Sequence, residues 1–394
     1  MTAGITRMAA AIAVAGALTG LSLIGASGVA GASAGLGPAG RPAGPVTAYV
    51  VNFLANTVTP INTVTNTAGR PIQVGEGPSA IVITPDGSTA YVVNSATDTV
   101  TPIRTATNTA GKEIQVGAGP SAIAITPDGT TAYVANGVSN TVTPINTATN
   151  TAGQPIQVGA GPSAIAITPD GTVAYVASAI AGTVTPISTA TNTAGQPIQA
   201  GVSPSIIAIT PDGQTAYVVN QNINADTVTP ISIATNTAGR PIKVGPYPHA
   251  IAITPDGSTA YVAGFNINVR PGQLGIGEVT PIHIATNTAG KAIDFGTNFP
   301  AFIAITRDGA TAYVTSGAGV TPISTATNTA GALIQAGDGP GAIAITPDGA
   351  TAYVADGGPA NAPAHTVTPI DIATNTAGAA IQVGLRPVAV AITP

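Results

Sequence analysis

Residues 120–158 read PSAIAITPDGTTAYVANGVSNTVTPINTATNTAGQPIQV, and close variants of this unit recur along the 394-residue chain. One tyrosine marks each unit, and successive tyrosines are 42, 42, 42, 42, 44, 52 and 40 residues apart. Repeats of this length are typical of propellers, solenoids and other arrays. The repeat therefore decides the fold, and a specific function is expected where the copies differ. The eight tyrosines are Tyr49, Tyr91, Tyr133, Tyr175, Tyr217, Tyr261, Tyr313 and Tyr353.

Each unit contains four short segments with strand character. Residues 122–126 and 131–134 flank Thr126-Pro127-Asp128-Gly129, which fits a type I turn with Pro second and Gly fourth. Residues 141–145 and 156–158 follow, separated by an Asn-Thr-Ala-Gly turn. Four strands in roughly 40 to 50 residues make one propeller blade.

The two ends of the array complement each other. The first unit, from residue 47, lacks its first strand, and residues 388–392 form such a strand with nothing after it. We therefore predict an all-β fold, a closed β-propeller of four-stranded antiparallel blades, in which the C-terminal strand completes the N-terminal blade and protects two edges. Eight blades are preferred and seven are the alternative. An open β-solenoid would require distinct capping units, and none is visible.

Proline occurs in the third strand of every unit. It cannot donate a hydrogen bond to a neighbouring strand and usually marks an edge or a bulge. We therefore expect the outermost strand to be short and to pair with only part of the third. The eight prolines are Pro60, Pro102, Pro144, Pro186, Pro230, Pro281, Pro322 and Pro369.

The composition agrees with short strands and tight turns. Charged residues are 7% of the chain and hydrophobic ones 44%, with 48 Gly and 34 Pro. The net charge is −5, and the 11 Lys and Arg are scattered singly, so we expect no nucleic-acid partner. The chain has no cysteine, which excludes disulfides and a lipid-modified cysteine.

The N-terminus has the pattern of a secretory signal. Residues 1–7 carry a positive charge, residues 8–24 are an apolar run, and Ala32-Ser33-Ala34 offers a cleavage site. We expect a signal peptide at 1–34, a flexible linker at 35–46 and the propeller at 47–394. The protein is then secreted or associated with the cell surface, with no membrane span after signal cleavage. The alternative is a membrane anchor formed by residues 8–24.

The repeat resembles the YVTN-type β-propeller family. The resemblance rests on Tyr91-Val92-Val93-Asn94, Thr99-Val100-Thr101-Pro102-Ile103, Gln115-Val116-Gly117 and Thr126-Pro127-Asp128-Gly129. It implies a secreted or cell-surface protein of bacterial or archaeal type, commonly with seven blades, and it supplies no catalytic motif. The present chain departs from the family in its eight units and in its Thr-Pro-Ile strands.

Length variation is confined to one predicted face. Strand direction alternates within a blade, so the loops between second and third strands share a face with the connections between blades. The loop between the second and third strands differs in length in four units. It is two residues shorter than standard at 316–319, two longer at 220–226, five longer at 356–365 and nine longer at 264–278. One further residue is added in the connection at 296–300. Loops on a rigid scaffold usually carry the binding residues.

Unusual side chains concentrate around the longest loop. Aromatic, amide and charged groups together suit a sugar, peptide or protein partner, such as a cell-wall glycan. The alternative is that the aromatic residues form a small local core that covers their own blade. The predicted ligand-binding residues are Tyr247, His249, Phe265, Asn266, Asn268, Arg270, Glu278, Asn298 and Phe299.

The pattern does not indicate catalysis, a metal site or a cofactor. Each turn aspartate stands alone before glycine, which favours a role in turn geometry over calcium binding. The three histidines occupy different positions of the unit, and no Gly-x-Ser-x-Gly motif is present in the repeats of residues 47–394. A binding or structural scaffold is the preferred interpretation, and a lactonase-like propeller hydrolase or lyase with a polar site near the central channel is the alternative. A quinone-dependent dehydrogenase is disfavoured because tryptophan and cysteine are absent.

Overall fold

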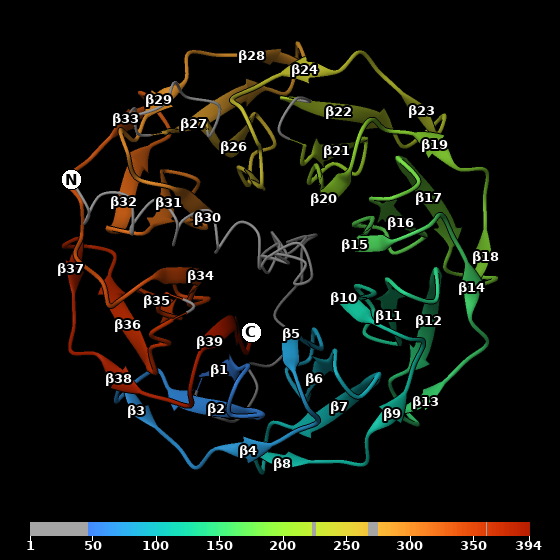
Figure 1. Ribbon diagram of the computed structural model, residues 1–394, viewed down its shortest axis with the longest axis horizontal. Helices are drawn as coiled ribbons and strands as arrows, with labels where there is room; N and C mark the ends of the chain where they lie inside the picture. Colours follow the sequence, from blue (N-terminus) through green and yellow to red (C-terminus); the bar gives the residue numbers. More distant parts are fainter. Residues whose placement is uncertain (1–45, 223–225, 267–274, 360) are drawn as a thin grey trace.

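The repeats form eight antiparallel sheets arranged as the blades of a closed ring (Figure 1). The computed structural model describes residues 46–222, 226–266, 275–359 and 361–394. In seven blades the strands run outward from the centre in chain order, and in the remaining blade the C-terminal strand takes the innermost place. We number the blades 1 to 8 by their tyrosines, so that blade 1 contains Tyr49 and blade 8 contains Tyr353. The predicted eight-bladed, all-β propeller is confirmed.

Each blade has two inner strands, of which the second is the more deeply buried. The first strands are β39 (Pro387–Ile392) in blade 1, then β5 (Pro78–Ile83), β10 (Pro120–Ile125), β15 (Pro162–Ile167), β20 (Pro204–Ile209), β25 (Ala250–Ile253), β30 (Pro300–Ile305) and β34 (Pro340–Ile345). The second strands are β1 (Thr47–Asn52), β6 (Thr89–Asn94), β11 (Thr131–Asn136), β16 (Val173–Ser178), β21 (Thr215–Asn220), β26 (Thr259–Asn266), β31 (Thr311–Ser316) and β35 (Thr351–Asp356).

The outer part of each blade is made of one further strand and one or two short segments. The third strands are β2 (Thr57–Asn62), β7 (Thr99–Arg104), β12 (Thr141–Asn146), β17 (Thr183–Ser188), β22 (Thr227–Ser232), β27 (Ile276–His283), β32 (Gly319–Ser324) and β36 (Thr366–Asp371). The outermost segments are β3 (Thr67–Ala68), β4 (Ile72–Gln73), β8 (Thr109–Ala110), β9 (Ile114–Gln115), β13 (Thr151–Ala152), β14 (Ile156–Gln157), β18 (Thr193–Ala194), β19 (Ile198–Gln199), β23 (Thr237–Ala238), β24 (Ile242–Lys243), β28 (Thr288–Ala289), β29 (Ile293–Asp294), β33 (Thr329–Ala330), β37 (Thr376–Ala377) and β38 (Ile381–Gln382).

Proline explains why the outermost strand is interrupted. In blade 3, β13 pairs with the end of β12 at Ile145 and β14 pairs with its start at Val142, so Pro144 lies beside the gap. The carbonyl of Pro144 accepts a hydrogen bond from the Gly153 backbone at 2.7 Å, while the proline has no N–H to offer. The expectation that the outer strand pairs with only part of the third is confirmed.

The ring closes as the sequence predicts. Strand β39, at the C-terminus, pairs with β1 in antiparallel register, with Val390 opposite Val50. Both valines are fully buried, in a core cluster that also contains Tyr353 of blade 8. N-terminal and C-terminal segments therefore build one blade together. Strand β1 is paired on both sides, and β39 takes the innermost place that the first strand has in every other blade.

The hydrophobic core is divided into clusters that lie between neighbouring blades, and it does not form one central core. One cluster, for example, joins Tyr133 and Val142 of blade 3 to Ala174 and Val176 of blade 4. Each of the eight repeat tyrosines is at most 1% exposed. Because every cluster draws on two neighbouring blades, a single blade cannot bury its own core.

A hydrogen bond from each repeat tyrosine links its blade to the next. The hydroxyl of Tyr133 donates to Asn192 Oδ1 at 2.6 Å, and the other seven tyrosines make the same bond at 2.5 or 2.6 Å. The eight acceptor asparagines have φ between 51° and 55°, a left-handed conformation that asparagine tolerates better than most residues. These bonds stabilise the ring all the way round, including Tyr353 to Asn66 across the closure between blades 8 and 1.

Hydrogen bonds between loops show which loops share a face of the disc. On one face, which we call the turn face, the Thr147 hydroxyl donates to the carbonyl of Gly129 in the first turn of the same blade, at 2.6 Å. On the other, the loop face, the loop after β11 meets the inter-blade connection where the Gly137 backbone donates to the Gly119 carbonyl at 2.7 Å. The described residues of the four loops of altered length lie on the loop face, as predicted.

The aspartates of the first turns act within those turns. Asp128 Oδ1 accepts hydrogen bonds from the Thr126 hydroxyl at 2.5 Å and from the Thr130 backbone at 3.0 Å. The side-chain bond from Thr126 is the main reason that the pKa of Asp128 lies below its ordinary value. The turn interpretation of these aspartates is therefore supported by their contacts.

Candidate ligand-binding site on the loop face

The long insertion of blade 6 begins and ends as a strand hairpin. Strands β26 and β27 have eight residues each, whereas most other second and third strands have six, and the extra pairs include Phe265 with Gly277 and Asn266 with Ile276. The backbone of Gly277 also exchanges hydrogen bonds with the connection after β29, donating to Gly296 and accepting from Phe295, both at 2.8 Å. A side chain at position 277 would collide with the backbone of that connection. The base of the insertion is thus fixed to its own blade.

Four of the predicted residues form one aromatic cluster at this base. The His249 and Phe299 rings stack with centroids 4.5 Å apart, and the Phe265 and Phe299 rings are tilted with centroids 5.0 Å apart. Tyr247 lies 6.2 Å from His249 between ring centroids. These separations are typical of favourable aromatic pairs. The three outer rings, Tyr247, Phe265 and Phe299, remain partly exposed.

His249 has a structural position within the cluster. It is 1% exposed, its Nδ1 lies 2.9 Å from the Tyr247 carbonyl oxygen, and its Nε2 contacts the carbonyl oxygen of Pro300 in blade 7. Ser121 contacts the next blade in the same way, donating to the Pro162 carbonyl at 3.0 Å. Burial lowers the pKa of His249, although its two carbonyl partners act in the opposite direction. The histidine replaces a repeat serine and supports the exposed rings from below.

Glu278 fills a space that other blades give to asparagine. In blade 2, Asn94 Nδ2 donates to Thr99 at 3.0 Å and to Thr101 at 2.8 Å, and its amide packs against Gly75. In blade 6 the asparagine is replaced by Gly264 and the first threonine by Glu278. The Glu278 carboxylate packs against Gly245, the counterpart of Gly75.

The electrostatic environment of Glu278 is acidic. Its pKa is raised, first by burial and then by the negative charges of Asp294 and Asp226. Asp294 is its partner across the pair β27 and β29. A partly exposed carboxylate that is disfavoured in its charged form is well suited to accept hydrogen bonds or a cationic group from a ligand.

The remaining predicted residues are placed less completely. Asn266 and Asn298 are both partly exposed, the first in the strand hairpin and the second in the connection before β30. Asn268 and Arg270 lie outside the described residues. Sequence reasoning missed Asp294 and the buried Phe295, because both belong to a segment that otherwise follows the repeat.

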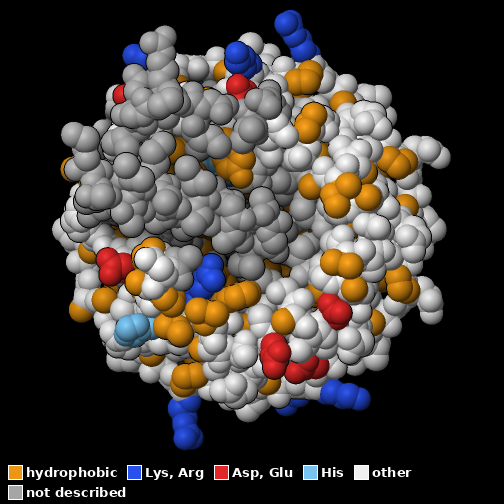
Figure 2. Space-filling model, viewed as in Figure 1, with side chains coloured by type: hydrophobic (Ala, Val, Ile, Leu, Met, Phe, Trp, Pro, Cys, Tyr) orange, Lys and Arg blue, Asp and Glu red, His pale blue; other side chains and the backbone are white. Residues whose placement is uncertain are grey.

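Metal-ligating side chains do not gather anywhere in the part of the chain that the structure describes: no group of three or more His, Asp or Glu could hold an ion there. His249, Glu278, Asp226 and Asp356 therefore form no such group. Among the same residues, no helix has the length and apolarity needed to cross a bilayer. Lys and Arg side chains lie mainly at the rim of the disc (Figure 2).

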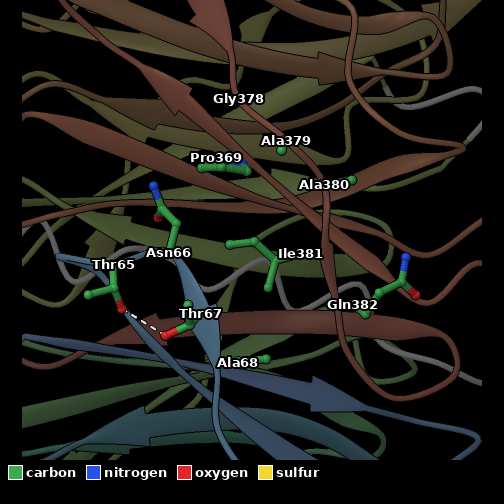
Figure 3. A pocket seen from close by; sticks show the side chains of 10 residues that line it. All are labelled: Thr65, Asn66, Thr67, Ala68, Pro369, Gly378, Ala379, Ala380, Ile381 and Gln382. Carbon is green, nitrogen blue, oxygen red and sulfur yellow. Dashed lines mark hydrogen bonds between the residues drawn. The ribbon is translucent and has the colours of Figure 1, made fainter.

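An open depression of about 510 Å³ lies elsewhere, at the outer wall between blades 1 and 8 (Figure 3). It is lined by residues 65–68, Pro369 and residues 378–382. Most of these are the Thr-Asn-Thr-Ala and proline positions that recur in every unit. The depression is therefore a property of the repeat and not a distinctive site.

Comparison with known proteins agrees with this architecture. Residues 73–181 match the family described as lactonase, 7-bladed beta-propeller. The chain is a β-propeller protein. The matched stretch covers regular blades, and the aromatic cluster of blade 6 lies outside it. No curated protein matches the chain.

Solved structures extend the likeness to most of the propeller. A chain of hydrazine synthase from Kuenenia stuttgartiensis is 26% identical, with a TM-score of 0.62 over 75% of this chain and 96% of that one. A functionally unknown protein from Desulfotomaculum acetoxidans is 18% identical, with a TM-score of 0.62 over 88% and 98%. The dihydro-heme d1 dehydrogenase NirN in complex with DHE is 15% identical, with a TM-score of 0.70 over 88% and 74%. The last two show the shared fold alone.

Proposed function

We propose that this propeller is a secreted or cell-surface binding protein whose ligand docks on the loop face of blade 6. The observation that carries the proposal is the aromatic cluster, in which Tyr247, Phe265 and Phe299 are partly exposed and the buried His249 contacts the first and the last of them. Rings that are already packed lose little freedom when a ligand covers them. The proposed localisation follows from residues 1–34, which have the pattern of a secretory signal.

The chemistry of the site favours a polyhydroxylated ligand, and a cell-wall glycan is the first candidate. Flat apolar rings can cover the C–H face of a sugar, and the Glu278 carboxylate can accept hydrogen bonds from its hydroxyls. A peptide or protein partner would use the same rings as apolar anchors. These partners are distinguished by the screen described next.

The test is a loop transplant within the chain. Residues 264–278 are replaced by residues 136–141 of blade 3, Asn-Gly-Val-Ser-Asn-Thr, which restores the asparagine and threonine of the regular blade. The chimera and the unchanged protein are then compared in pull-downs on insoluble cell-wall glycans and in a screen of secreted proteins. We expect the chimera to keep its fold and to lose binding. Equal binding by a folded chimera would remove blade 6 as the site.

The family match to lactonase propellers favours one alternative, a lactone hydrolase. Both proteins are therefore assayed for proton release from a panel of lactones. The binding proposal expects no hydrolysis above the background rate. Turnover by the unchanged protein would replace the scaffold interpretation, and its loss in the chimera would place the reaction at blade 6.

A further inference from the structure

A second unusual place on the loop face lies at the closure of the ring, in the connection that leads into β39. The equivalent connections of four other blades have glycine at one position, Gly77, Gly119, Gly161 and Gly339, with φ between 62° and 66°. Arg386 occupies this position with φ 57°. A long side chain is disfavoured in the left-handed region, so the arginine is retained there against the local backbone preference.

The guanidinium group of Arg386 is stacked but not neutralised. Its Cζ lies 5.4 Å from the centroid of the Phe53 ring, and both side chains are partly exposed. Phe53 is itself a departure from the repeat, because the equivalent residues are Ser95, Gly137 and Ala179. Within the described residues Arg386 has no carboxylate partner. A guanidinium that is held by an aromatic face keeps its N–H groups free for a planar anion.

Three segments far apart in the sequence hold this arrangement. The Phe53 backbone donates to the Arg386 carbonyl at 2.9 Å, and the Leu54 backbone donates to the Leu385 carbonyl at 3.2 Å. The Arg386 backbone donates to Ala364, in the second-longest insertion, at 2.8 Å. The backbone around the guanidinium is therefore fixed before any ligand arrives.

Two exposed leucines belong to the same pair of loops as the cation. Leu54 is 46% exposed and Leu385 is 41% exposed, and both are next in sequence to the stacked pair. Water-exposed leucines beside a single unpaired cation suit a ligand that has one anionic group and an apolar body.

We propose that Arg386, Phe53, Leu54 and Leu385 form a site for an organic carboxylate with an apolar chain. The carboxylate accepts two parallel hydrogen bonds from the guanidinium, and the chain covers the two leucines. The site lies at the closure of blades 8 and 1 and shares no residue with the aromatic cluster of blade 6, so the proposal goes beyond the proposed function.

The test uses hexanoate and hexanamide as probes, with dissociation constants from NMR titration of the purified protein. Hexanamide has the same apolar chain without the charge. We expect hexanoate to bind saturably and at least about tenfold more tightly than hexanamide, since the ion pair contributes only to the acid. No saturable binding of hexanoate, or equal affinity for the two probes, overturns the proposal.

Variants separate the site from general surface charge. Arg386→Gly places the repeat residue in its preferred conformation, so the variant is expected to fold, and it should weaken hexanoate binding at least about tenfold. Arg386→Lys keeps the charge but not the planar fork and should bind more weakly than the unchanged protein. Arg104→Asn is the matched control, because the equivalent residue is Asn62 in blade 1 and Asn146 in blade 3, and it should change nothing.

The outcomes also separate this site from the proposed function. The blade 6 chimera should bind hexanoate as the unchanged protein does, whatever happens to its glycan binding. Undiminished hexanoate binding by folded Arg386→Gly, or equal losses in Arg386→Gly and Arg104→Asn, would overturn the assignment to the closure.

Discussion

Replacing Tyr353 by phenylalanine tests whether the tyrosine hydrogen bonds hold the ring together at its closure. The Tyr353 hydroxyl donates to Asn66 Oδ1 at 2.5 Å, and these two residues are 287 positions apart in sequence. The phenyl ring of the variant fills the same buried space, so no cavity forms. The change therefore removes this bond between blade 8 and the N-terminal part of blade 1, together with a longer contact of 3.3 Å from the same hydroxyl to the Thr63 carbonyl.

The expected cost follows from the surroundings of the two groups. A neutral hydrogen bond contributes about 0.5–1.5 kcal/mol to folding, and more when its loss leaves a buried partner unsatisfied. Here the acceptor residue, Asn66, is exposed, so water replaces the lost donor. We therefore expect Tyr353→Phe to lower the free energy of unfolding by roughly 0.5–1 kcal/mol.

The assay is urea unfolding followed by circular dichroism, within a double-mutant cycle. Asn66→Gly is the second substitution, because glycine tolerates the φ of 52° at this position. If the bond stabilises the ring, the two changes are non-additive by roughly the value of the single Tyr353→Phe change. The matched control is Tyr133→Phe with Asn192→Gly, between blades 3 and 4, where the chain is continuous. Additive effects at both pairs would refute the hydrogen-bond argument.

Three further predictions concern stability. Burial raises the pKa of five repeat tyrosines to about 12 from the ordinary 10.0. Their contribution to the free energy of unfolding is therefore complete below pH 10 and is lost as the pH rises toward 12. The midpoint of urea unfolding should fall over that range, and a constant midpoint would contradict the prediction. Burial also raises the pKa of Asp356 to about 6 from 3.8, so stability should decline as the pH rises through this interval. Asp356→Asn, which restores the residue found at Asn52, should abolish that decline, and an unchanged pH profile would exclude Asp356 as its source. Deletion of residues 387–394 removes β39 and exposes β1, so we expect aggregation or loss of the cooperative transition, whereas a monomeric variant with unchanged melting would show that closure is dispensable.

The architecture could be predicted because the sequence pattern of each repeat indicates where its strands and turns lie. The missing first strand at residue 47 and the surplus strand at the C-terminus together predicted the pairing of β1 with β39. The prolines of the third strands predicted the interrupted outer strand, since a missing N–H has the same effect in every blade. The tyrosine bonds between blades were not predicted, because the sequence does not say which turn lies beside which hydroxyl.

The candidate site could be predicted only as a region. The concentration of unusual residues between Tyr247 and Phe299 indicated blade 6, and four of these side chains do lie together. Their roles depend on distances that only the folded ring sets. His249 looks like an exposed ligand-binding residue in sequence, yet it is 1% exposed and replaces a serine that contacts the next blade. The stack of Arg386 on Phe53 was missed because those residues are distant in sequence and meet only through the closure.

Departure from the repeat at a single position locates the two proposed sites more narrowly than loop length does. Among the described residues, non-glycine side chains occupy the left-handed position of the inter-blade connections at Ser203, Tyr247 and Arg386. Two of these three are large, and each lies in a place where a ring or a cation meets a second unusual aromatic residue. The backbone favours glycine at this position for steric reasons. A bulky residue there lowers the stability of the blade, although the blade can be built with glycine. Tyr247 and Arg386 are therefore the two positions on the loop face where we propose that a side chain serves ligand binding and not the packing of the ring.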